Sequence, residues 1–436
     1  MRRLVSLVAS VAVALSATIA WAQALPAARP VQVGLSPERL DRIGQIFRSE
    51  IEKGKLPGAV VLVARRGRIA YFEGLGLRDR TTGAPMTPDA IFRIYSMTKP
   101  LVSVGAMILI EDGRAVLTDP VSKFLPPLGK LQVSVPKTDS VSGKVTYTMV
   151  PAEREMTIQD LLRHTAGLAY GELTANAPVK DAYAKAGLYA PEGLPFDPRG
   201  ITPTEEVERL AAAPLAHQPG TVWDYSLATD VLGRVIEAIS GMPLGRFLEE
   251  RLFVPLKMTD SGFFVPGEKL GRVAQPFATD PATGSPIRLI DVSAPPKNDS
   301  GGAGGVSTAA DYLRFSQMLL HGGRLDGARV LSRTTVAWMT ADHLGRLADL
   351  ALTPGELLLG VPGYTFGLGF AVRREAGLAG TPGSAGEYTW GGFAGTYFWI
   401  DPKEELVGIL MTQAPGPLRV HYRKLFRQLV YQAIAD

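Results

Sequence analysis

Apolar residues recur along this chain at two periods, and the period separates the expected helices from the expected strands. Where apolar positions fall three and four residues apart behind a capping residue or a proline, the pattern predicts a helix. Helices are expected over about 36–53, from 157, and over about 202–214, 227–241, 243–253, 308–320 and 425–434. Short apolar runs bounded by turn residues predict strands over 58–64, 69–76, 366–372, 387–390, 396–401 and 406–412.

The expected strands lie at both ends of the chain, and the expected helices fill its middle. This distribution predicts an α+β fold in which one sheet is assembled from both ends, is covered by helices and carries an inserted helical domain. We expect a discontinuous α/β sandwich domain over 25–110 and 300–436, and a mainly helical domain over 111–299.

Three further patterns concern the middle of the chain. Alternating residues over 131–135 and 145–149, separated by a polar tip, predict a small surface hairpin within 131–150. Residues 167–200 are rich in alanine, glycine and proline, which is typical of a lid or a pocket wall. The glycine-rich residues 301–305 predict a flexible joint before the helix that starts near 308.

The first 24 residues have the pattern of a cleaved signal peptide. Arg2 and Arg3 precede an apolar run over 4–20, and small residues then mark cleavage after Ala22 or Ala24. The alternative is a membrane anchor, but the run is short for a membrane span and ends in the cleavage pattern. We therefore expect a periplasmic or secreted protein with no stable membrane span once the signal is removed.

Composition removes several classes of function. The chain has no cysteine, which excludes disulfides, thiolate zinc sites and a cysteine nucleophile. The net charge of +4 is not gathered into a basic tract, so nucleic acid is not an expected partner. The histidines are scattered without ligand spacing, and we expect neither a metal nor another cofactor; they are His164, His217, His321, His343 and His421.

Ser96 and Lys99 form a Ser-x-x-Lys sequence at the start of an expected helix. Residues three apart share one helical face, so the lysine would lie beside the serine hydroxyl. A serine needs such a base, and the positive end of the helix dipole disfavours the charged form of the lysine. A second copy, Ser134 to Lys137, lies in an alternating run that contains a proline, so its side chains would not share a face.

Two later stretches could complete a site. Tyr225 precedes a buried helix, and a nearby lysine would stabilise its phenolate, which could then take the serine proton. The alternative is a core tyrosine. Gly391 and Gly392 lie on a late strand next to Trp390, and paired glycines there indicate close approach to the backbone. A substrate carbonyl that meets the Phe393 amide, or a plain bulge, would explain them.

Taken together, these sequences resemble the β-lactamase-related serine hydrolases, and most closely the family VIII carboxylesterases, which are relatives of class C β-lactamases and D,D-peptidases. The resemblance implies an antiparallel sheet flanked by helices, with the site in the cleft beside the helical domain. It implies Ser96 as the acylated nucleophile, Lys99 and Tyr225 as the base system, and the backbone amides of Ser96 and Phe393 as the oxyanion hole. The motifs that carry it are Ser96-Met97-Thr98-Lys99, Tyr225-Ser226-Leu227 and Trp390-Gly391-Gly392.

Two departures from the class C pattern bear on the substrate. Leu227 stands where class C β-lactamases have asparagine, and Trp390-Gly391-Gly392 stands where they have Lys-Thr-Gly. These apolar residues, expected to contact the substrate, suit an uncharged acyl or alcohol group. We therefore expect a small carboxylic ester with a short acyl chain as the substrate. The alternatives are a β-lactamase or D,D-peptidase, an acyltransferase that uses the same acyl-enzyme, and a non-catalytic binding relative. The pattern makes no prediction of oligomeric state.

Overall fold

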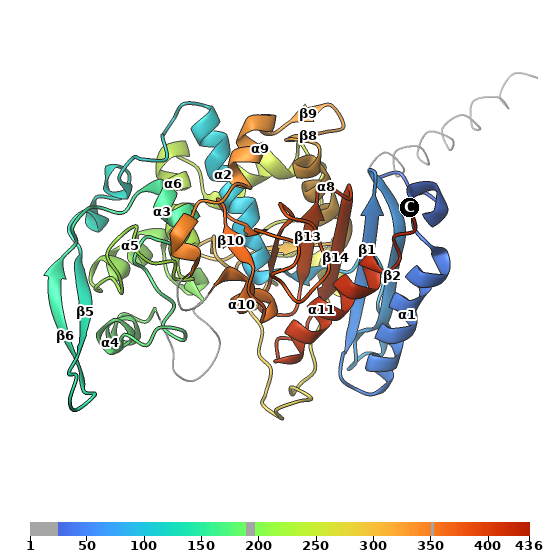
Figure 1. Ribbon diagram of the computed structural model, residues 1–436, viewed down its shortest axis with the longest axis horizontal. Coiled ribbons are helices and arrows are strands. Elements are labelled where there is room, and N and C mark those ends of the chain that lie inside the picture. The colour runs from blue at the N-terminus through green and yellow to red at the C-terminus, as the bar shows by residue number, and fades with distance from the viewer. Residues whose placement is uncertain (1–24, 189–196, 350–352) are drawn as a thin grey trace, which may run out of the picture.

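The structure is a computed structural model that describes residues 25–188, 197–349 and 353–436 (Figure 1). The expected signal peptide, residues 1–24, lies outside the described residues, as does part of the expected pocket wall, residues 189–196. Within the described ranges, no helix is both long enough and apolar enough to cross a membrane.

Eight strands form one antiparallel sheet whose middle joins the two ends of the chain. β1 (Gly58–Arg65) is buried along its whole length and pairs with β14 (Leu406–Thr412) on one side and β2 (Arg68–Asp79) on the other. This pairing confirms the expected sheet built from both ends. The other strands are β3 (Ala84–Pro85) beyond β2 and, outward from β14, β13 (Tyr397–Asp401), β12 (Tyr388–Gly391), β11 (Ala371–Arg373) and β10 (Tyr364–Phe366).

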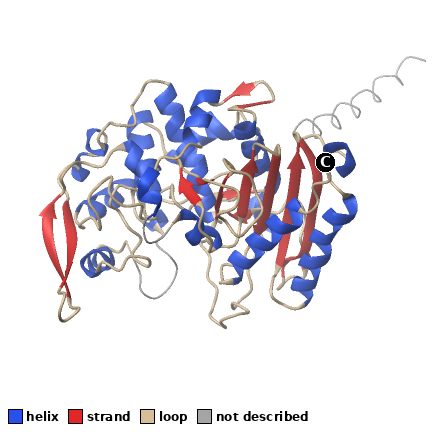
Figure 2. Ribbon diagram, viewed as in Figure 1, coloured by secondary structure: helices blue, strands red, loops and turns tan. Residues whose placement is uncertain are grey.

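Helices cover both faces of this sheet, and two neighbouring residues of β13 mark the two sides. Trp399 contacts Phe426 of α11 (Leu418–Tyr431), with 5.3 Å between ring centroids, and α11 packs beside α1 (Pro37–Glu52). Phe398 contacts Tyr312 of α8 (Ala309–Leu320) at 4.8 Å. Because successive side chains of a strand point to opposite faces, α11 and α8 lie on opposite sides of the sheet (Figure 2).

α2 (Thr98–Glu111) connects the sheet to the helical part of the chain. Nearly all of its residues are buried, as expected for a helix at the centre of a large core, and it packs against α6 (Ala228–Ser240). The other helices of this part are α3 (Ile158–Leu162), α4 (Ala177–Lys185), α5 (Pro203–Ala211) and α7 (Leu244–Leu248), which continues as a π-helical turn over Glu249–Phe253.

The expected hairpin is present as β5 (Gln132–Thr138) and β6 (Val145–Pro151), which pair along their whole length. In Figure 1 it lies at the edge of the molecule farthest from the sheet. Strands therefore do gather from both ends, with helices between them. The boundaries of the two domains stay a prediction.

Two expected elements differ from the structure. The single strand expected over 366–372 is a reversal between β10 and β11, at which Gly369 takes a left-handed φ of 96°. The last helix, α11, begins at Leu418 instead of 425. Its first turns place Arg419 and Arg423 where the apolar pattern needs hydrophobic residues, and Arg423 is buried.

Several elements were not predicted at all, because they are too short to show a period. They are the helices α9 (Arg333–Met339) and α10 (Pro354–Leu359) and the two-residue strands β4 (Phe92–Arg93), β7 (Val306–Ser307), β8 (Arg324–Leu325) and β9 (Ala328–Arg329).

Candidate active site

Ser96 lies in a single 3₁₀ turn, Tyr95–Met97, that runs directly into α2. Tyr95, the residue before it, has a φ of 44°, a conformation that is strained for a non-glycine residue and that is often found beside active sites. The turn is held by the Thr98 hydroxyl, which donates to the Tyr95 carbonyl at 2.6 Å. Ser96 is therefore fixed at the N-terminus of a buried helix.

Lys99, in the first turn of α2, reaches back to Ser96. Its Nζ lies 3.3 Å from the Ser96 Oγ, and it also donates to the Tyr170 Oη at 3.0 Å and to the Gly302 carbonyl at 2.8 Å. The side chain is 1% exposed, so it depends on these partners for hydrogen bonds. Three acceptors match the three N–H donors of an ammonium group.

Tyr225 completes a contact triangle with Ser96 and Lys99. Its hydroxyl donates to the Ser96 Oγ at 2.7 Å, and the Lys99 Nζ lies 4.7 Å from the centroid of its ring. The ring is held on two sides by Trp390, at 5.3 Å, and by His164, at 5.0 Å. The structure thus brings together the three residues that the sequence predicts for catalysis, although they lie on separate elements.

Tyr170 is the functional candidate that sequence reasoning missed. Its hydroxyl accepts from Lys99, and its ring lies 5.3 Å from the ring of Tyr225. Burial raises the pKa of Tyr170 well above its usual range, and the neighbouring Tyr225 and Asp230 raise it further. Tyr170 therefore stays protonated and serves as a hydrogen-bond partner. The only signal in the sequence was its place in the alanine- and glycine-rich stretch expected to form a pocket wall.

The glycine-rich residues 301–305 are not the flexible joint that the sequence predicts. Asp230 accepts hydrogen bonds from the Ser300 hydroxyl at 2.6 Å and from the Gly302 amide at 3.0 Å. A Cβ at Gly302 would overlap the Asp230 carboxylate, and one at Gly301 would overlap the Thr229 carbonyl. Glycine is needed here for close packing, which fixes the carbonyl that Lys99 binds.

A similar explanation holds for the two glycines after Trp390. A Cβ at Gly391 would lie 2.9 Å from the Arg423 Cζ, and one at Gly392 would overlap the Ile94 carbonyl. The close approach comes from the protein itself, so these glycines need no substrate to explain them. The Arg423 guanidinium also donates to the Gly392 carbonyl at 2.5 Å, which holds the backbone that leads into Phe393.

A cavity of about 200 Å³ opens over Ser96 and includes Tyr170, Tyr225, Trp390, Gly391, Gly392 and Phe393 in its lining. Of the residues expected to contact substrate, Leu227 is the exception: it is 1% exposed, packs in the core at the start of α6 and does not line this cavity. Sites for drug-sized ligands measure about 300–1,000 Å³. The smaller cavity fits a small substrate.

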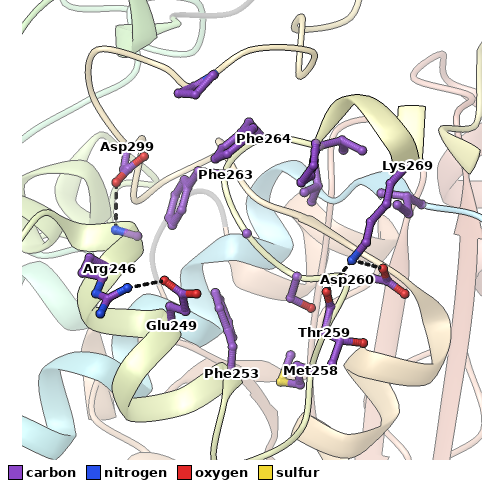
Figure 3. A pocket seen from close by; sticks show the side chains of 18 of the residues that line it. Arg246, Glu249, Phe253, Met258, Thr259, Asp260, Phe263, Phe264, Lys269 and Asp299 are labelled. Carbon is purple, nitrogen blue, oxygen red and sulfur yellow. Dashed lines mark hydrogen bonds and ion pairs between the residues drawn. The ribbon is translucent and has the colours of Figure 1, made fainter. Parts of the chain in front are cut away.

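A larger hollow of about 770 Å³ lies elsewhere, between α7 and the segments 257–266 and 295–299 (Figure 3). Four of its charged side chains form ion pairs, Arg246 with Glu249 and Lys269 with Asp260, and Asp299 accepts a hydrogen bond from the Gly245 amide (Figure 3). The serine in its lining, Ser261, hydrogen-bonds to Ser307 and Asp311. Size alone therefore does not identify the active site, and the chemical groups point to the smaller cavity.

His164 illustrates the role of the histidines here. It is buried beneath Tyr225, its Nδ1 lies 3.3 Å from the Ser226 Oγ, and burial together with the Lys99 charge lowers its pKa well below the usual range. It is therefore neutral and fits the structural role expected of it. Within the described ranges, no three histidine, aspartate or glutamate side chains are grouped so that they could hold a metal ion.

A buried acid behind the site predicts a pH dependence of stability. Burial, with repulsion from Asp230, raises the pKa of Glu206 to about 7, although Arg234 lies 3.7 Å away and opposes this shift. The carboxylate also accepts a hydrogen bond from the Asn298 amide at 2.9 Å. Because the folded state binds this proton more tightly than the unfolded state, its stabilising contribution is complete below the ordinary carboxyl pKa and is lost as the pH rises through about 7.

Glu206→Gln, which keeps the shape without the charge, should remove that loss. Between pH 5 and pH 8 we expect the free energy of unfolding of the wild type to fall by up to about 3 kcal/mol more than that of the variant. Urea titrations at the two pH values measure the difference. Glu208→Gln, an exposed position on the same helix, should behave like the wild type. Parallel pH profiles for all three proteins would contradict the prediction.

A serine hydroxyl that contacts a tyrosine and a lysine beneath a small cavity can act as the nucleophile in acyl transfer. Comparison with known proteins agrees with this class. The sequence pattern of the family described as Beta-lactamase matches residues 43–432, and the chain therefore belongs to the β-lactamase family. This confirms the family indicated by the three sequence motifs.

Three relatives are similar over nearly the whole chain. Protein Rv1367c of Mycobacterium tuberculosis is 37% identical, covering 84% of this chain and 88% of its own. Esterase EstB of Burkholderia gladioli is 32% identical, covering 88% and 93%. The solved structure of EstCE1, described as a hydrolase with promiscuous acyltransferase activity, superimposes with a TM-score of 0.71 at 29% identity, covering 90% and 98%. These likenesses confirm the α+β fold of the β-lactamase type.

Proposed function

We propose that the protein hydrolyses small carboxylic esters with short acyl chains through an acyl-enzyme on Ser96. The observation that carries the proposal is the contact of the Ser96 Oγ with the Tyr225 Oη at 2.7 Å and the Lys99 Nζ at 3.3 Å. The small cavity above them supports a short acyl group. The names of EstB and EstCE1 support ester hydrolysis.

In the first half of the reaction, the Ser96 Oγ attacks the ester carbonyl carbon and its proton passes to the Tyr225 oxygen. This step uses Tyr225 after its own hydroxyl proton has left, and the Lys99 Nζ lies 4.7 Å from the centroid of its ring. The carbonyl oxygen becomes an oxyanion, and the amides of Ser96 and Phe393 are the proposed donors to it. The bond from the carbonyl carbon to the alcohol oxygen then breaks, and the alcohol leaves with the proton from Tyr225.

In the second half, water replaces the alcohol. It gives a proton to Tyr225 while its oxygen bonds to the acyl carbon, and the Ser96 Oγ leaves and recovers that proton. Tyr170 and the Gly302 carbonyl keep Lys99 in place throughout, because they bind its other two N–H donors. Trp390 packs against Tyr225 and forms an apolar wall of the cavity.

The test compares kcat/KM for p-nitrophenyl acetate, butyrate and octanoate with that for nitrocefin, a β-lactam, with Ser96→Ala as the blank. We expect Ser96-dependent cleavage of the esters to dominate and to fall from butyrate to octanoate. Faster turnover of nitrocefin would overturn the esterase proposal in favour of a β-lactamase.

Acyl transfer is the second candidate, because the name of EstCE1 includes that activity. The same acyl-enzyme would then be captured by an alcohol instead of water. Adding a short alcohol to the ester assay separates the two. A transferase forms the new ester in preference to the acid, whereas a hydrolase forms mainly the acid.

We also propose that the protein is exported, on the strength of the N-terminal pattern alone. N-terminal sequencing of the protein recovered from the periplasm or the medium tests this. The mature chain should begin at Gln23 or Leu25, and a chain that keeps residues 1–24 inside the cell would contradict it.

A further inference from the structure

The hollow beside α7, of about 770 Å³, is larger than the cavity of about 200 Å³ over Ser96. Its volume lies within the range of about 300–1,000 Å³ that is usual for small-molecule sites. None of the residues that line it also lines the cavity over Ser96. The hollow is therefore a separate cavity, and the proposed ester hydrolysis makes no use of it.

Three phenylalanines from two parts of the chain supply the aromatic part of its lining (Figure 3). Phe253 ends the π-helical turn that follows α7, and Phe263 and Phe264 lie in the loop after it. Phe264 is 37% exposed, and Val254, the neighbour of Phe253, is 65% exposed. Exposed apolar side chains that gather in one hollow, unlike single ones scattered over a surface, are typical of a binding site.

Two uncommon backbone features border the hollow. Glu249–Phe253 is a π-helical turn, which is rare and is often found at functional sites. Lys257 has a φ of 55°, in the left-handed region, which is strained for a residue other than glycine. Both features belong to the wall from which Phe253 and Met258 line the hollow. They support a functional role for the shape of this wall.

Asp299 is a charged group at the opposite end of the hollow, next to Phe263. A Cβ at Gly245 would lie 2.8 Å from the Asp299 Oδ2 and 3.1 Å from the Phe263 ring, so both side chains lie against the same point. In the described part of the chain, the carboxylate accepts one hydrogen bond, from the Gly245 amide at 2.8 Å. Burial raises the pKa of Asp299, although this amide and the charge of Arg234 oppose the shift. The carboxylate is thus partly desolvated, and its Oδ1 is left for a ligand.

Among the described residues, the Asp299 carboxylate has no ion-pair partner. Arg246 and Lys269 form the ion pairs described above, and Lys257 is exposed. None of these three cations lies close enough to act on the pKa of Asp299. Arg234 does act on it, but its guanidinium donates to the backbone carbonyl of Asp299, at 2.7 Å, and not to the carboxylate.

The charge of Asp299 decides which kind of ligand fits. A neutral apolar molecule would cover the carboxylate and remove its water without replacing the lost hydrogen bonds. An anion would add repulsion. An ammonium group would donate a charge-assisted hydrogen bond to the carboxylate, and phenylalanine rings attract organic cations. An apolar body attached to that ammonium would find Phe253, Phe264 and Val254 in the same hollow.

We propose that this hollow is a second ligand site, which binds a small organic cation with an aromatic or similarly apolar body. Asp299 binds the ammonium group, with Phe263 beside it, and Phe253 and Phe264 contact the apolar body. The proposal goes beyond the esterase reaction and does not depend on it, because these residues lie outside the cavity over Ser96.

The test compares three soluble probes of similar size by isothermal titration calorimetry, at neutral pH and constant ionic strength. They are 2-phenylethylamine, which is a cation, 2-phenylethanol, which is neutral, and phenylacetate, which is an anion. We expect the Kd of the amine to be at least about tenfold below the other two, the lower end of the range for a charge-assisted hydrogen bond. Equal binding of the amine and the alcohol, or tighter binding of phenylacetate, would overturn the cation site.

Asp299→Asn should weaken binding of the amine by about 10- to 100-fold, the range for a lost charge-assisted hydrogen bond, and leave the alcohol unchanged. Asparagine keeps an oxygen that accepts from the Gly245 amide. Glu249→Gln is the matched control, because it removes an acid of the same hollow that already pairs with Arg246. It should leave the Kd of the amine within about threefold. Equal losses in the two variants would contradict a specific contact with Asp299.

Two more variants keep the proposal testable if Asp299→Asn does not fold. Phe264→Ala, at a partly exposed position, should weaken binding of both the amine and the alcohol several-fold, because it removes part of the apolar wall. Glu172→Gln removes an acid from the cavity over Ser96 and should leave the amine unaffected. The reverse pattern would place the amine in the active-site cavity and overturn the second site.

Inhibition kinetics separate this proposal from the esterase function. Competitive inhibition of ester cleavage by the amine, with a Ki equal to its Kd, would also overturn the second site. Failure of the proposed function would instead appear as no Ser96-dependent cleavage of any ester, while the amine would still bind in the hollow.

Discussion

Ser96→Ala is expected to lower kcat/KM for p-nitrophenyl butyrate by about 10⁵-fold or more, which corresponds to about 7 kcal/mol of transition-state stabilisation. The variant lacks the oxygen that would become acylated, which in the wild type contacts Lys99 at 3.3 Å and Tyr225 at 2.7 Å. The thermal midpoint should change little, because the removed atom faces the cavity.

The second Ser-x-x-Lys copy supplies a matched control for this prediction. Ser134 lies on β5 and donates to the Asn176 side chain at 2.8 Å, while Lys137 is exposed on the same strand. The two residues therefore do not form a pair. Ser134→Ala should keep full activity. Both variants are purified in the same way, so that contaminating activity would appear in both. Near-wild-type turnover by Ser96→Ala would then refute the assignment of Ser96 as the nucleophile.

Tyr225→Phe is expected to reduce kcat by about 10²- to 10⁴-fold, the range for loss of a general acid–base group, while KM changes by only a few-fold. The substitution removes one oxygen, 2.7 Å from the Ser96 Oγ, and keeps the ring that packs against Trp390 and His164. Steady-state kinetics on p-nitrophenyl butyrate separate the two parameters.

Tyr170→Phe provides the comparison, because it makes the same chemical change to the other tyrosine that contacts Lys99. Tyr170 hydrogen-bonds to Lys99, whereas Tyr225 hydrogen-bonds to Ser96 itself, so Tyr170→Phe should lose clearly less activity than Tyr225→Phe. If Tyr225→Phe raised KM and left kcat unchanged, Tyr225 would be a binding residue. If the two variants lost the same activity, the proton would not pass specifically through Tyr225.

Much of the fold could be read from the sequence, because helices and strands impose local periods on apolar residues. The continuous apolar run of β1 and the expected strands at both ends of the chain were enough to predict a sheet assembled from both termini. The pairing of β1 with β14 confirms this prediction. The sequence pattern predicted the wrong start for α11, because Arg419 and Arg423 in its first turns line the cavity. A helix that presents charged residues to a cavity does not follow the apolar pattern.

The pairing of Ser96 with Lys99 was also predictable, since both lie within one turn and local geometry alone brings them together. The place of Tyr225 was inferred from family resemblance, and its distance from Ser96 comes only from the structure. The glycines of 301–305 show the limit of composition. In isolation they indicate a mobile joint, but Thr229 packs too closely against Gly301, and Asp230 against Gly302, for a side chain at either position.

The sequence by itself therefore determined the family, the main elements and the nucleophile with its lysine, because each depends on residues close together in the chain. Only the tertiary structure decided that Tyr170 and the Gly302 carbonyl complete the environment of Lys99, that Leu227 packs in the core, and that two arginines of α11 line the cavity over Ser96. The physical reason is that these contacts join residues far apart in the chain. Their positions depend on how helices and sheet pack, which no local period encodes.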